Sequence, residues 1–407
     1  MSGSASKKRI LFVDDEQNVL SGLRRTLRNQ RKVWEMEFVG SAQEALRKAD
    51  ESHFDAVVTD MRMPGMDGSE LLDRMAESHP DAVRVVLSGQ SDQQSVMKTV
   101  GPAHQYLNKP CEIDILKGIL ARAFQLRDLL GEDRLKSLIT GMRTLPSLPA
   151  LYSELMKMIQ DPNSSVTDVG ELVAKDPAMT VKILQLVNSA FFGLGRHVSS
   201  PVDAASLLGL DVLKSLVLSI GIFKQFEADK FDIKSFSLDA LWSHSAWVGS
   251  LAKQIAKEEG MGSRTVEDSL LAGMLHDIGK LILVINLSTG YAQLQEARRD
   301  TLDDRVSSEI EIFGATHGAV GAYLLGLWGL PESVVEAVAL HNQPVLQGEK
   351  VFSVLSVVHA ANALVHVAEE ETVLDNLLDL DYLDSIGVAG RVETWKMLSS
   401  IADLDRV

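Results

Sequence analysis

Hydrophobic and polar positions divide the chain into two parts with different periodicity. Between residues 9 and 127, short apolar runs alternate with longer stretches whose apolar residues recur at helical spacing. Such short runs are typical of strands buried on both faces of a sheet, and the longer stretches of the helices that cover it. The pattern predicts an α/β domain with a doubly wound parallel sheet of five strands. The predicted strands are 10–13, 36–39, 56–59, 83–87 and 106–107, and the predicted helices are 19–27, 42–49, 71–75, 95–100 and 113–126.

Beyond residue 145 the alternation stops, and long amphipathic runs follow with few strand signals. This pattern predicts an all-helical domain over 143–368. Residues 1–8 are expected to form a flexible tail and 369–407 an acidic helical appendage. Residues 128–142 are expected to extend the last helix as a linker, although Gly131 could interrupt it. The predicted helical runs are 147–160, 166–174, 178–188, 202–226, 238–258, 265–287, 304–326, 332–342 and 349–368.

Composition narrows the class of protein. Apolar residues make up 45% and charged residues 24% of the 407, which excludes a disordered chain. The net charge of −16 disfavours nucleic acid and anionic membranes as partners. A single cysteine, Cys111, excludes a disulfide framework and a cysteine-rich zinc site. The longest uncharged stretches, 312–331 and 351–368, contain glycine, proline or polar residues and fit buried helices better than membrane spans. We therefore expect a cytoplasmic protein.

Polar residues whose side chains could take part in a reaction follow four of the predicted strands. Asp14 and Asp15 end the first strand, Asp60 the third and Ser88 the fourth, and Lys109 comes shortly after the fifth. Ligands of an open parallel sheet bind outside the carboxyl ends of its strands, so these residues are expected to converge. A single aspartate after a strand is usually a helix cap or a turn former. Five such residues after four different strands, with matching loops, favour a common site.

The chemistry of these side chains suggests phosphoryl transfer. Three carboxylates in one pocket repel each other, and a hard divalent cation such as Mg²⁺ relieves that repulsion. Asp60 can then attack a phosphoryl group as a carboxylate nucleophile. The Lys109 ammonium and the Ser88 hydroxyl can hold the remaining phosphoryl oxygens.

Residues 9–127 resemble the receiver domain of two-component response regulators. The motifs that carry the resemblance are TDMRMPGMDG around Asp60, VVLSGQ around Ser88 and YLNKP around Lys109. The resemblance implies a flavodoxin-like fold and phosphorylation of Asp60 by a sensor histidine kinase or a phosphotransfer protein. It further implies a Mg²⁺ site made by Asp14, Asp15, Asp60 and the backbone carbonyl of Arg62, a switch pair of Ser88 and Tyr106, a phosphoryl-binding Lys109, a cis Lys109–Pro110 peptide, and control of phosphoryl lifetime by Arg62 and Gln90.

The helical part contains a set of histidines that suggests a second site. His244 lies in LWSHSAWV, His276 and Asp277 in GMLHDIGK, His317 in ATHGAVGAYLL and His341 in ALHNQP. Adjacent His276 and Asp277 can face one metal ion if a helix turn directs them, and Lys280 one turn later can hold a phosphate. The alternative is a polar cluster that stabilises a helical core. The remaining histidines are expected to be ordinary core or surface residues: His53, His79, His104, His197, His359 and His366.

The 145–342 stretch resembles the HDOD branch of the HD superfamily of metal-dependent phosphohydrolases. The resemblance rests on LPSLP, DPAMTVKILQLVNSAFFG and LLGLDVLKSLVLS, and it implies an all-α HD-type domain that signals without catalysis. Asn362 stands where an active HD site has an aspartate ligand, and Asn342 where the phosphodiesterase branch has a second histidine. The glycine–tyrosine–proline signature of that branch is missing from QPVLQGEK. No catalytic residue is therefore expected in this domain. We also expect the histidine set to lack a transition metal rather than to bind one.

Together these features predict a response regulator that signals through protein–protein contact. Phosphorylation of Asp60 would act through the linker on the HDOD domain, which would bind a downstream protein that the sequence does not identify. The linker helix could also pair with its copy in a homodimer. The alternative is a receiver-gated phosphohydrolase of a cyclic dinucleotide or nucleotide, with metal held by His244, His276, Asp277, His317 and His341.

Overall fold

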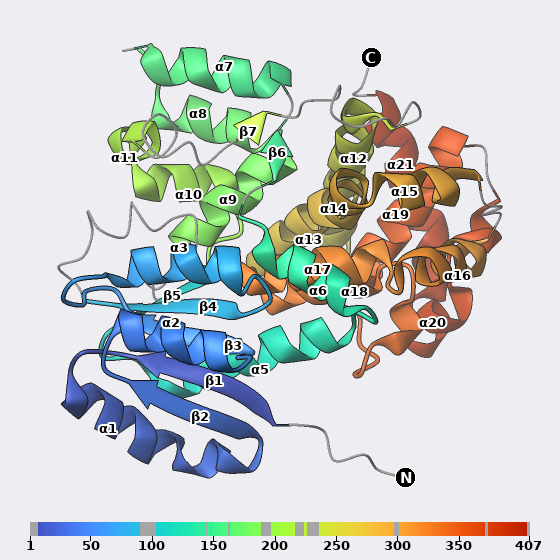
Figure 1. Cartoon of the computed structure of the whole chain (residues 1–407). Helices are drawn as coiled ribbons and strands as arrows, with labels where there is room; N and C mark the ends of the chain where they lie inside the picture. The colour runs from blue at the N-terminus through green and yellow to red at the C-terminus, as the bar shows by residue number, and fades with distance from the viewer. Residues whose placement is uncertain are drawn as a thin grey trace, which may run out of the picture.

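The computed structural model shows an α/β region followed by a helical region (Figure 1). The predicted helix 95–100 and Gln90 lie outside the residues that the structure describes, as do most of the expected tail and part of the run 202–226. The described residues are 7–89, 103–143, 145–147, 149–161, 163–188, 197–215, 224–225, 236–296, 301–370 and 373–404.

The N-terminal region is the doubly wound parallel sheet that the sequence predicts. Its strand order is β2-β1-β3-β4-β5, and every pairing is parallel. All five predicted strands are confirmed, each within two residues of its predicted ends. The strands are β1 Lys8–Val13, β2 Trp34–Val39, β3 Ala56–Asp60, β4 Val83–Ser88 and β5 Gln105–Asn108; the described helices around them are α1 Gln17–Thr26, the 3₁₀ helix η1 Leu27–Lys32, α2 Ala42–Glu51, α3 Gly68–Ser78 and α5 Ile113–Asp128.

Local sequence explains how this region is built. Every residue of β3 and β4 is buried, as expected for central strands covered on both faces. The side chains of Ser41 and Asp67 cap α2 and α3 by accepting hydrogen bonds from the backbone N–H groups of Glu44 and Glu70. Only glycine fits at position 68, because a Cβ there would lie 2.1 Å from the backbone oxygen of Asp60. This close approach folds the loop back over the end of β3.

The rest of the described chain is almost entirely helical, as predicted. A short parallel pair, β6 Pro146–Ser147 and β7 Lys224–Gln225, is the exception. The α-helices are α6 Asp133–Gly141, α7 Pro149–Gln160, α8 Val166–Val173, α9 Pro177–Val187, α10 Pro201–Leu208, α11 Leu210–Ser215, α12 Leu238–Glu258, α13 Ser263–Leu275, α14 Ile278–Asn286, α15 Ser288–Glu296, α16 Leu302–Phe313, α17 His317–Leu327, α18 Glu332–Leu340, α19 Val354–Glu370, α20 Leu380–Ser385 and α21 Val392–Leu404, with 3₁₀ helices η5 Pro344–Leu346, η6 Leu374–Asn376 and η7 Ala389–Arg391.

Three of the predicted helical runs are broken. The run 202–226 divides at Gly209, which has a φ of 79°, into α10 and α11, and its residues 224–225 belong to β7. The other two runs are each broken in two. Within the predicted run 304–326, α16 ends at Gly314, which has a left-handed φ of 72°. A second helix, α17, begins after Thr316, and the Thr316 side chain caps it. The run 265–287 is interrupted at His276 and Asp277, between α13 and α14. Apolar periodicity continues through both breaks, so it could not reveal them.

The linker is a separate helix rather than an extension of α5. The chain turns at Gly131, whose N–H donates to the oxygen of Gly314 over 3.2 Å; a Cβ there would lie 2.7 Å from that oxygen. The following helix, α6, buries Leu135 and Ile139 inside the same chain. Its apolar face is therefore covered without a second copy of the protein.

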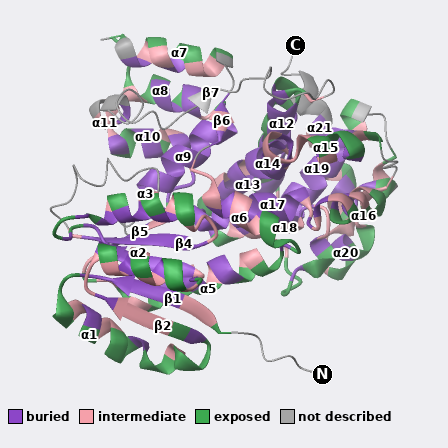
Figure 2. Cartoon of the chain, viewed as in Figure 1, coloured by how far each residue is buried: buried purple, intermediate pink, exposed green. Residues whose placement is uncertain are grey.

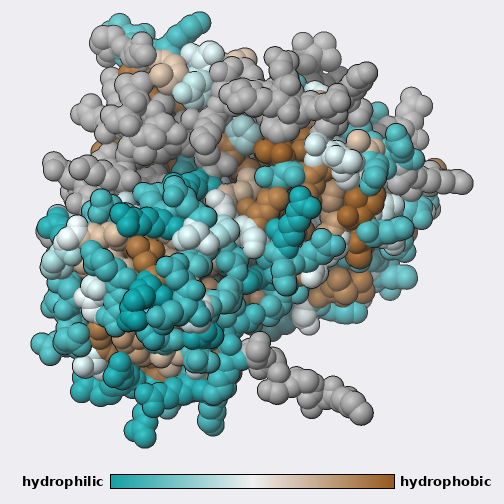
Figure 3. Space-filling model, in the orientation of Figure 1, coloured by the Kyte–Doolittle hydropathy of each residue, from teal (hydrophilic) through white to brown (hydrophobic). Residues whose placement is uncertain are grey.

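One hydrophobic core joins the two regions. It includes Ile10 and Phe12 on one face of the sheet and continues through the helical region to Trp395, whereas a second, smaller cluster lies on the opposite face of the sheet. Buried residues fill the sheet and the inner helices in Figure 2. The visible surface over the α/β region is mostly hydrophilic, and hydrophobic patches show over the helical region (Figure 3).

The described helices were compared in length and apolarity with what a membrane-spanning helix requires. No single helix in the described part of the chain is long and apolar enough to cross a membrane, although two sharply bent helix pairs together reach that length and composition.

Candidate functional site

The carboxyl edge of the parallel sheet brings together three of the predicted side chains. Lys109 Nζ lies 2.7 Å from Asp14 Oδ2 and 2.5 Å from Asp60 Oδ1. Asp14 directly follows β1, Asp60 ends β3, and Lys109 directly follows β5. Residues that are 95 positions apart in sequence therefore share one ionic cluster, as the parallel topology predicts.

Asp60 is held in a defined orientation and keeps access to solvent. Its Oδ2 accepts a hydrogen bond of 3.1 Å from the backbone N–H of Arg62, and 11% of its side chain is exposed. Burial raises the pKa of the Asp60 carboxyl, and Lys109 opposes that rise. Burial also disfavours the charged form of Lys109, but Asp14 and Asp60 together raise its pKa above the ordinary value. The ammonium therefore stays charged between the two carboxylates.

The other predicted residues of this edge occupy different positions. Asp15 is exposed at the rim, and its carboxylate makes no hydrogen bond or ion pair with the described residues. The Ser88 hydroxyl is fully buried without a hydrogen-bond partner in the described part of the chain. Tyr106 is buried too, and burial raises the pKa of its hydroxyl, which therefore stays neutral. The Lys109–Pro110 peptide is cis, as the resemblance implied.

The donor set at this edge fits Mg²⁺. Asp14 and Asp60 supply two carboxylates and Lys109 one ammonium, which leaves one net negative charge in a largely buried site. Carboxylate and carbonyl oxygens are the ligands that Mg²⁺ prefers. Asp15 directly follows Asp14, and Arg62 lies two residues after Asp60; their part in the ligand set stays a prediction.

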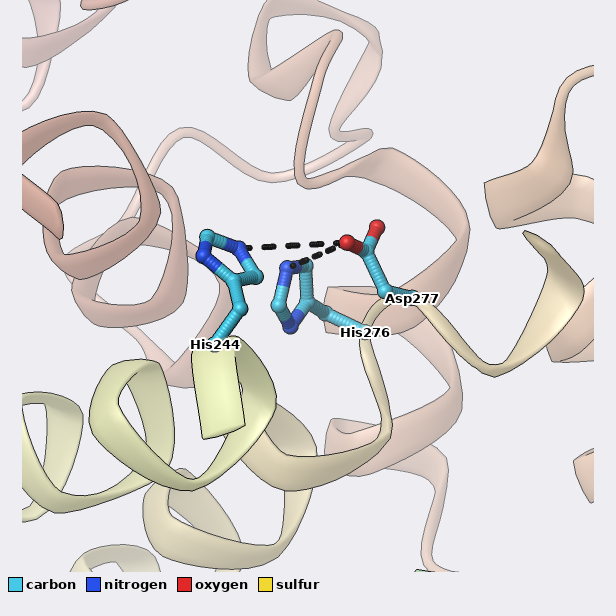
Figure 4. A group of neighbouring side chains, drawn as sticks. All are labelled: His244, His276 and Asp277. Carbon is cyan, nitrogen blue, oxygen red and sulfur yellow. Dashed lines mark ion pairs between the residues drawn. The ribbon is translucent and has the colours of Figure 1, made fainter. Parts of the chain in front are cut away.

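A second cluster lies in the helical region and contains every histidine of the predicted set. His244 comes from α12, His276 and Asp277 from the break between α13 and α14, His317 from the start of α17 and His341 from the end of α18. All five side chains are buried. Figure 4 shows His244 and His276 facing the Asp277 carboxylate. The Nε2 atoms lie 3.8 Å (His244), 3.4 Å (His276), 3.0 Å (His317) and 3.9 Å (His341) from a carboxylate oxygen of Asp277.

The other ring nitrogen of each histidine contacts a fixed acceptor. Nδ1 of His276 donates to the Gly273 oxygen over 2.7 Å, and Nδ1 of His341 to the Val338 oxygen over 2.9 Å. For the remaining two the partner is a carboxylate: Glu309 lies 2.6 Å from Nδ1 of His317, and Glu369 lies 2.8 Å from Nδ1 of His244. Metal-bound histidines typically show this pattern, with the outer nitrogen fixed and Nε2 directed inward.

The charge state of the cluster also suits a cation. Burial alone would raise the pKa of Asp277, but its interactions with His276 and Lys280 hold that pKa well below its ordinary value. Burial lowers the pKa of His276 and of His341, so both rings are neutral at pH 7. The Nε2 atom of His276 is buried without a hydrogen-bond partner among the described residues. An ionised carboxylate next to neutral imidazoles, one with an orphaned nitrogen, is a group of donors that could hold a metal ion.

His317 and Lys280 behave differently because carboxylates surround them. Burial disfavours the charged form of His317, but Glu309 and Asp277 raise its pKa to about 9. Lys280 Nζ lies 2.6 Å from Asp277 Oδ2, and this carboxylate outweighs burial to raise the Lys280 pKa. Both groups neutralise Asp277 in the absence of a metal ion. A small pocket of about 40 Å³ opens beside them; Arg305, Asn342 and His366 are among its lining residues.

The two departures from the active HD pattern both lie at this cluster. Asn362 Oδ1 is 3.1 Å from His244 Nε2, and Asn342 Nδ2 is 3.5 Å from His317 Nε2. The amides therefore occupy the positions where an aspartate and a histidine were expected in an active enzyme. An amide oxygen is a weaker, uncharged ligand.

Sequence reasoning missed three residues of the cluster. His366, interpreted as a core or surface residue, has its ring centre 4.6 Å from that of His244, and Glu369 contacts the same histidine. Asn362, His366 and Glu369 are spaced i, i+4, i+7 on α19, and this helical spacing was a signal that could have identified them. Glu309 had no such signal, because it reaches His317 across the turn at Gly314.

Two families match the chain. The response regulator receiver domain matches residues 10–121, and the HDOD domain matches residues 145–344. The chain therefore joins a response regulator receiver domain to an HDOD domain. The resemblances seen in the sequence are thereby confirmed for both regions.

Individual relatives are similar over parts of the chain. An uncharacterized protein of Treponema pallidum is 26% identical over 233 residues, which is 56% of this chain and 43% of that protein. The hydrogenase transcriptional regulatory protein HoxA of Cupriavidus necator is 28% identical over 217 residues, 49% of this chain and 44% of that protein. This chain thus spans less than half of either relative. The solved MmoQ response regulator of Methylococcus capsulatus is 20% identical and covers 61% of this chain and 97% of its own, with a TM-score of 0.47.

Proposed function

We propose that this response regulator accepts a phosphoryl group on Asp60 and signals through its HDOD domain by contact with another protein. Receiver domains exchange phosphoryl groups with histidine kinases or phosphotransfer proteins. The observation that supports the proposal here is the ionic cluster of Asp14, Asp60 and Lys109, in which Asp60 alone ends a strand with an oxygen partly open to solvent. A sensor histidine kinase is the donor that we expect.

The cluster can perform the transfer with few groups. An Asp60 oxygen attacks the phosphorus of a phosphohistidine, the phosphorus–nitrogen bond breaks, and the imidazole leaves with the electron pair, so that an acyl phosphate forms. When bound, Mg²⁺ neutralises the charge of the phosphoryl oxygens. Lys109 then binds one of these oxygens and gives up part of its contact with Asp60. The Ser88 hydroxyl of β4, which has no hydrogen-bond partner among the described residues, would donate to another, and Tyr106 would follow its movement.

A labelling experiment tests this proposal. The protein is incubated with Mg²⁺ and acetyl phosphate, and its intact mass is recorded over time. Asp60→Asn should abolish the added phosphoryl group, because the amide is not a nucleophile. Asp50→Asn, a matched change at an exposed position of α2, should be labelled like the wild type. Equal labelling of wild type and Asp60→Asn would refute the proposal.

The histidine cluster supports a second proposal, that the HDOD domain holds a transition-metal ion. The specific observation is that four buried imidazoles direct Nε2 toward the ionised Asp277 while their Nδ1 atoms are fixed. Because Asn362 stands in place of an aspartate, the cluster has one anionic ligand fewer than an active HD site. The Glu369 carboxylate still contacts His244. We do not extend this proposal to hydrolysis, because the amides Asn342 and Asn362 occupy positions that an active enzyme would use.

Metal analysis distinguishes this proposal from a metal-free polar cluster. Protein purified without chelators, with oxygen excluded, should contain Fe, Mn or Zn in stoichiometric amount, and a His276→Gln variant should lose it. A His53→Gln variant, at a half-exposed position of the receiver domain, provides the control. An equal, substoichiometric metal content in the wild type and both variants would refute metal binding and would indicate that the cluster only stabilises the helical core.

A further inference from the structure

One helix connects the histidine cluster with the receiver domain. His317 is the first residue of α17 and a member of the cluster, whereas Tyr323 and Leu327 lie near its other end. All eleven residues of α17 are buried, and the helix is about 16 Å long at 1.5 Å per residue. It packs against α18 and α14 of the HDOD domain and against α5 and α6 (Figure 1).

The N-terminal end of α17 is held at backbone contact distance. A Cβ on Gly279 of α14 would lie 1.9 Å from the backbone oxygen of His317. A Cβ on Gly318 would lie 2.8 Å from backbone oxygens of α18, and one on Gly321 2.9 Å from Ile278. These contacts leave no space for side chains between the helices. Any shift of α17 must therefore change the position of His317 relative to Asp277.

The receiver domain contacts the opposite end of the same helix. Gln105 of β5 donates from Nε2 to the Leu327 oxygen over 2.9 Å. Gly326 faces Leu126 of α5, and a Cβ there would lie 2.1 Å from a Leu126 methyl carbon. The β5–α5 surface of the receiver domain thus packs directly on α17.

A buried polar path makes a third connection. Tyr323 OH lies 2.7 Å from Thr140 Oγ1, which itself donates to the Lys136 oxygen, so the tyrosine is the donor. The Thr140 backbone oxygen accepts from the guanidinium of Arg84 over 2.8 Å. Arg84 is fully buried in β4, four residues before Ser88. The path therefore runs from the strand that carries Ser88, through α6, to α17.

We propose that α17 couples the receiver domain to the histidine cluster, so that the state of the Asp60 edge and the state of the cluster bias each other. Closely packed helices have few alternative arrangements, so a small change at one end is transmitted rather than absorbed. The coupling is reciprocal by thermodynamic necessity. The part played by phosphorylation rests on the function proposed above, whereas the coupling through α17 does not.

A double-mutant cycle read by hydrogen exchange tests the coupling. His317→Gln perturbs the cluster end, and Tyr323→Phe removes the hydroxyl that links α17 to Thr140. Amide exchange is measured by mass spectrometry in β5 and α5 of the receiver domain, in the wild type, both single variants and the double variant. We expect His317→Gln to change the exchange rates there about fivefold, and this change to be largely lost in the Tyr323→Phe background. Effects that are absent, or simply additive, would overturn the proposal.

Two controls keep the cycle decisive. Tyr382→Phe removes another buried, hydrogen-bonded tyrosine hydroxyl, which contacts Ser356 away from the receiver domain, and should leave the His317→Gln effect intact. If His317→Gln fails to fold, Glu309→Gln replaces it, because this change loosens the same helix end and keeps the imidazole.

A second arm separates this inference from the proposed phosphorylation. Beryllofluoride with Mg²⁺ is added as a phosphoryl mimic, and exchange is followed at residues 60–68 and at 276–281 and 317–321. Protection of 60–68 with a change at the cluster segments supports coupling to the phosphoryl state. Protection of 60–68 alone overturns it. Without protection at 60–68 the phosphoacceptor proposal fails, and the mutant cycle still decides whether α17 couples the two domains.

Discussion

The receiver edge and the histidine cluster differ in how their buried carboxylates are neutralised. At the receiver edge, Asp14 and Asp60 share one ammonium, and Lys109 remains about a fifth exposed. In the cluster, Asp277 is surrounded by Lys280 and four imidazoles whose outer nitrogens are all fixed. The first site leaves charge uncompensated and open to a transient ligand, whereas the second is compensated and closed. The comparison suggests a chemical role for the first and a structural or regulatory role for the second.

The largest expected effect concerns the ammonium of the receiver edge. Lys109→Gln removes the only cation within 4 Å of the Asp14 and Asp60 carboxylates in the described part of the chain. We expect the rate of labelling by acetyl phosphate to fall about a hundredfold, as for the loss of one donor to a developing charge. Lys117→Gln, which removes an ammonium of α5 that pairs with exposed Asp114, should label at the wild-type rate. A similar rate for both variants would show that Lys109 serves stability alone.

The corresponding change in the closed cluster should affect stability. Asp277→Asn leaves Lys280 without its anion and should lower the free energy of unfolding by roughly 2 kcal/mol. Urea unfolding followed by circular dichroism measures the effect, with exposed Asp303→Asn of α16 as the control. Phosphoryl labelling of Asp60 should continue in this variant. An unchanged midpoint would contradict the view of Asp277 as the charge centre of the cluster.

Backbone contact at the receiver edge gives the next prediction. Gly68→Ala would place a Cβ 2.1 Å from the Asp60 oxygen and should destabilise the protein by about 1–3 kcal/mol. Gly22→Ala in α1 meets open space and should stabilise it by about 0.5–1 kcal/mol. Thermal unfolding of both variants measures the sign. The same sign for both would show that the close approach over β3 is not a constraint.

A dependence of stability on pH tests the boundary between the two domains. Lys182 of α9 is buried beside the Arg143 oxygen and Gln185, and burial lowers its pKa to about 7. Above that pH the unfolded chain binds a proton that the folded chain lacks, so stability should rise with pH from about 7 to 10, by at most about 1.4 kcal/mol per pH unit. Below about pH 7 the cost of burying the charge is complete. Lys182→Met should remove this slope in urea unfolding, and an unchanged slope would assign it to other groups.

The same contrast explains what the sequence could predict. Asp14, Asp60 and Lys109 each follow a strand, and parallel topology then brings them to one edge, so the site followed from the order of elements. The breaks at His276 and at Gly314 were not predicted, because apolar residues keep helical spacing across them. Glu309 and Glu369 contact the outer nitrogens of His317 and His244, and these contacts depend on how separate helices pack.

The most direct test of the central claim is to locate the phosphoryl group chemically. After incubation with acetyl phosphate and Mg²⁺, borohydride reduces an acyl phosphate to an alcohol, which converts the modified aspartate into homoserine. Tandem mass spectrometry of the digested protein then identifies the position. The account predicts homoserine at residue 60 alone, in amounts that follow the labelling. Labelled protein that carries homoserine at another aspartate, or none at residue 60, would contradict it.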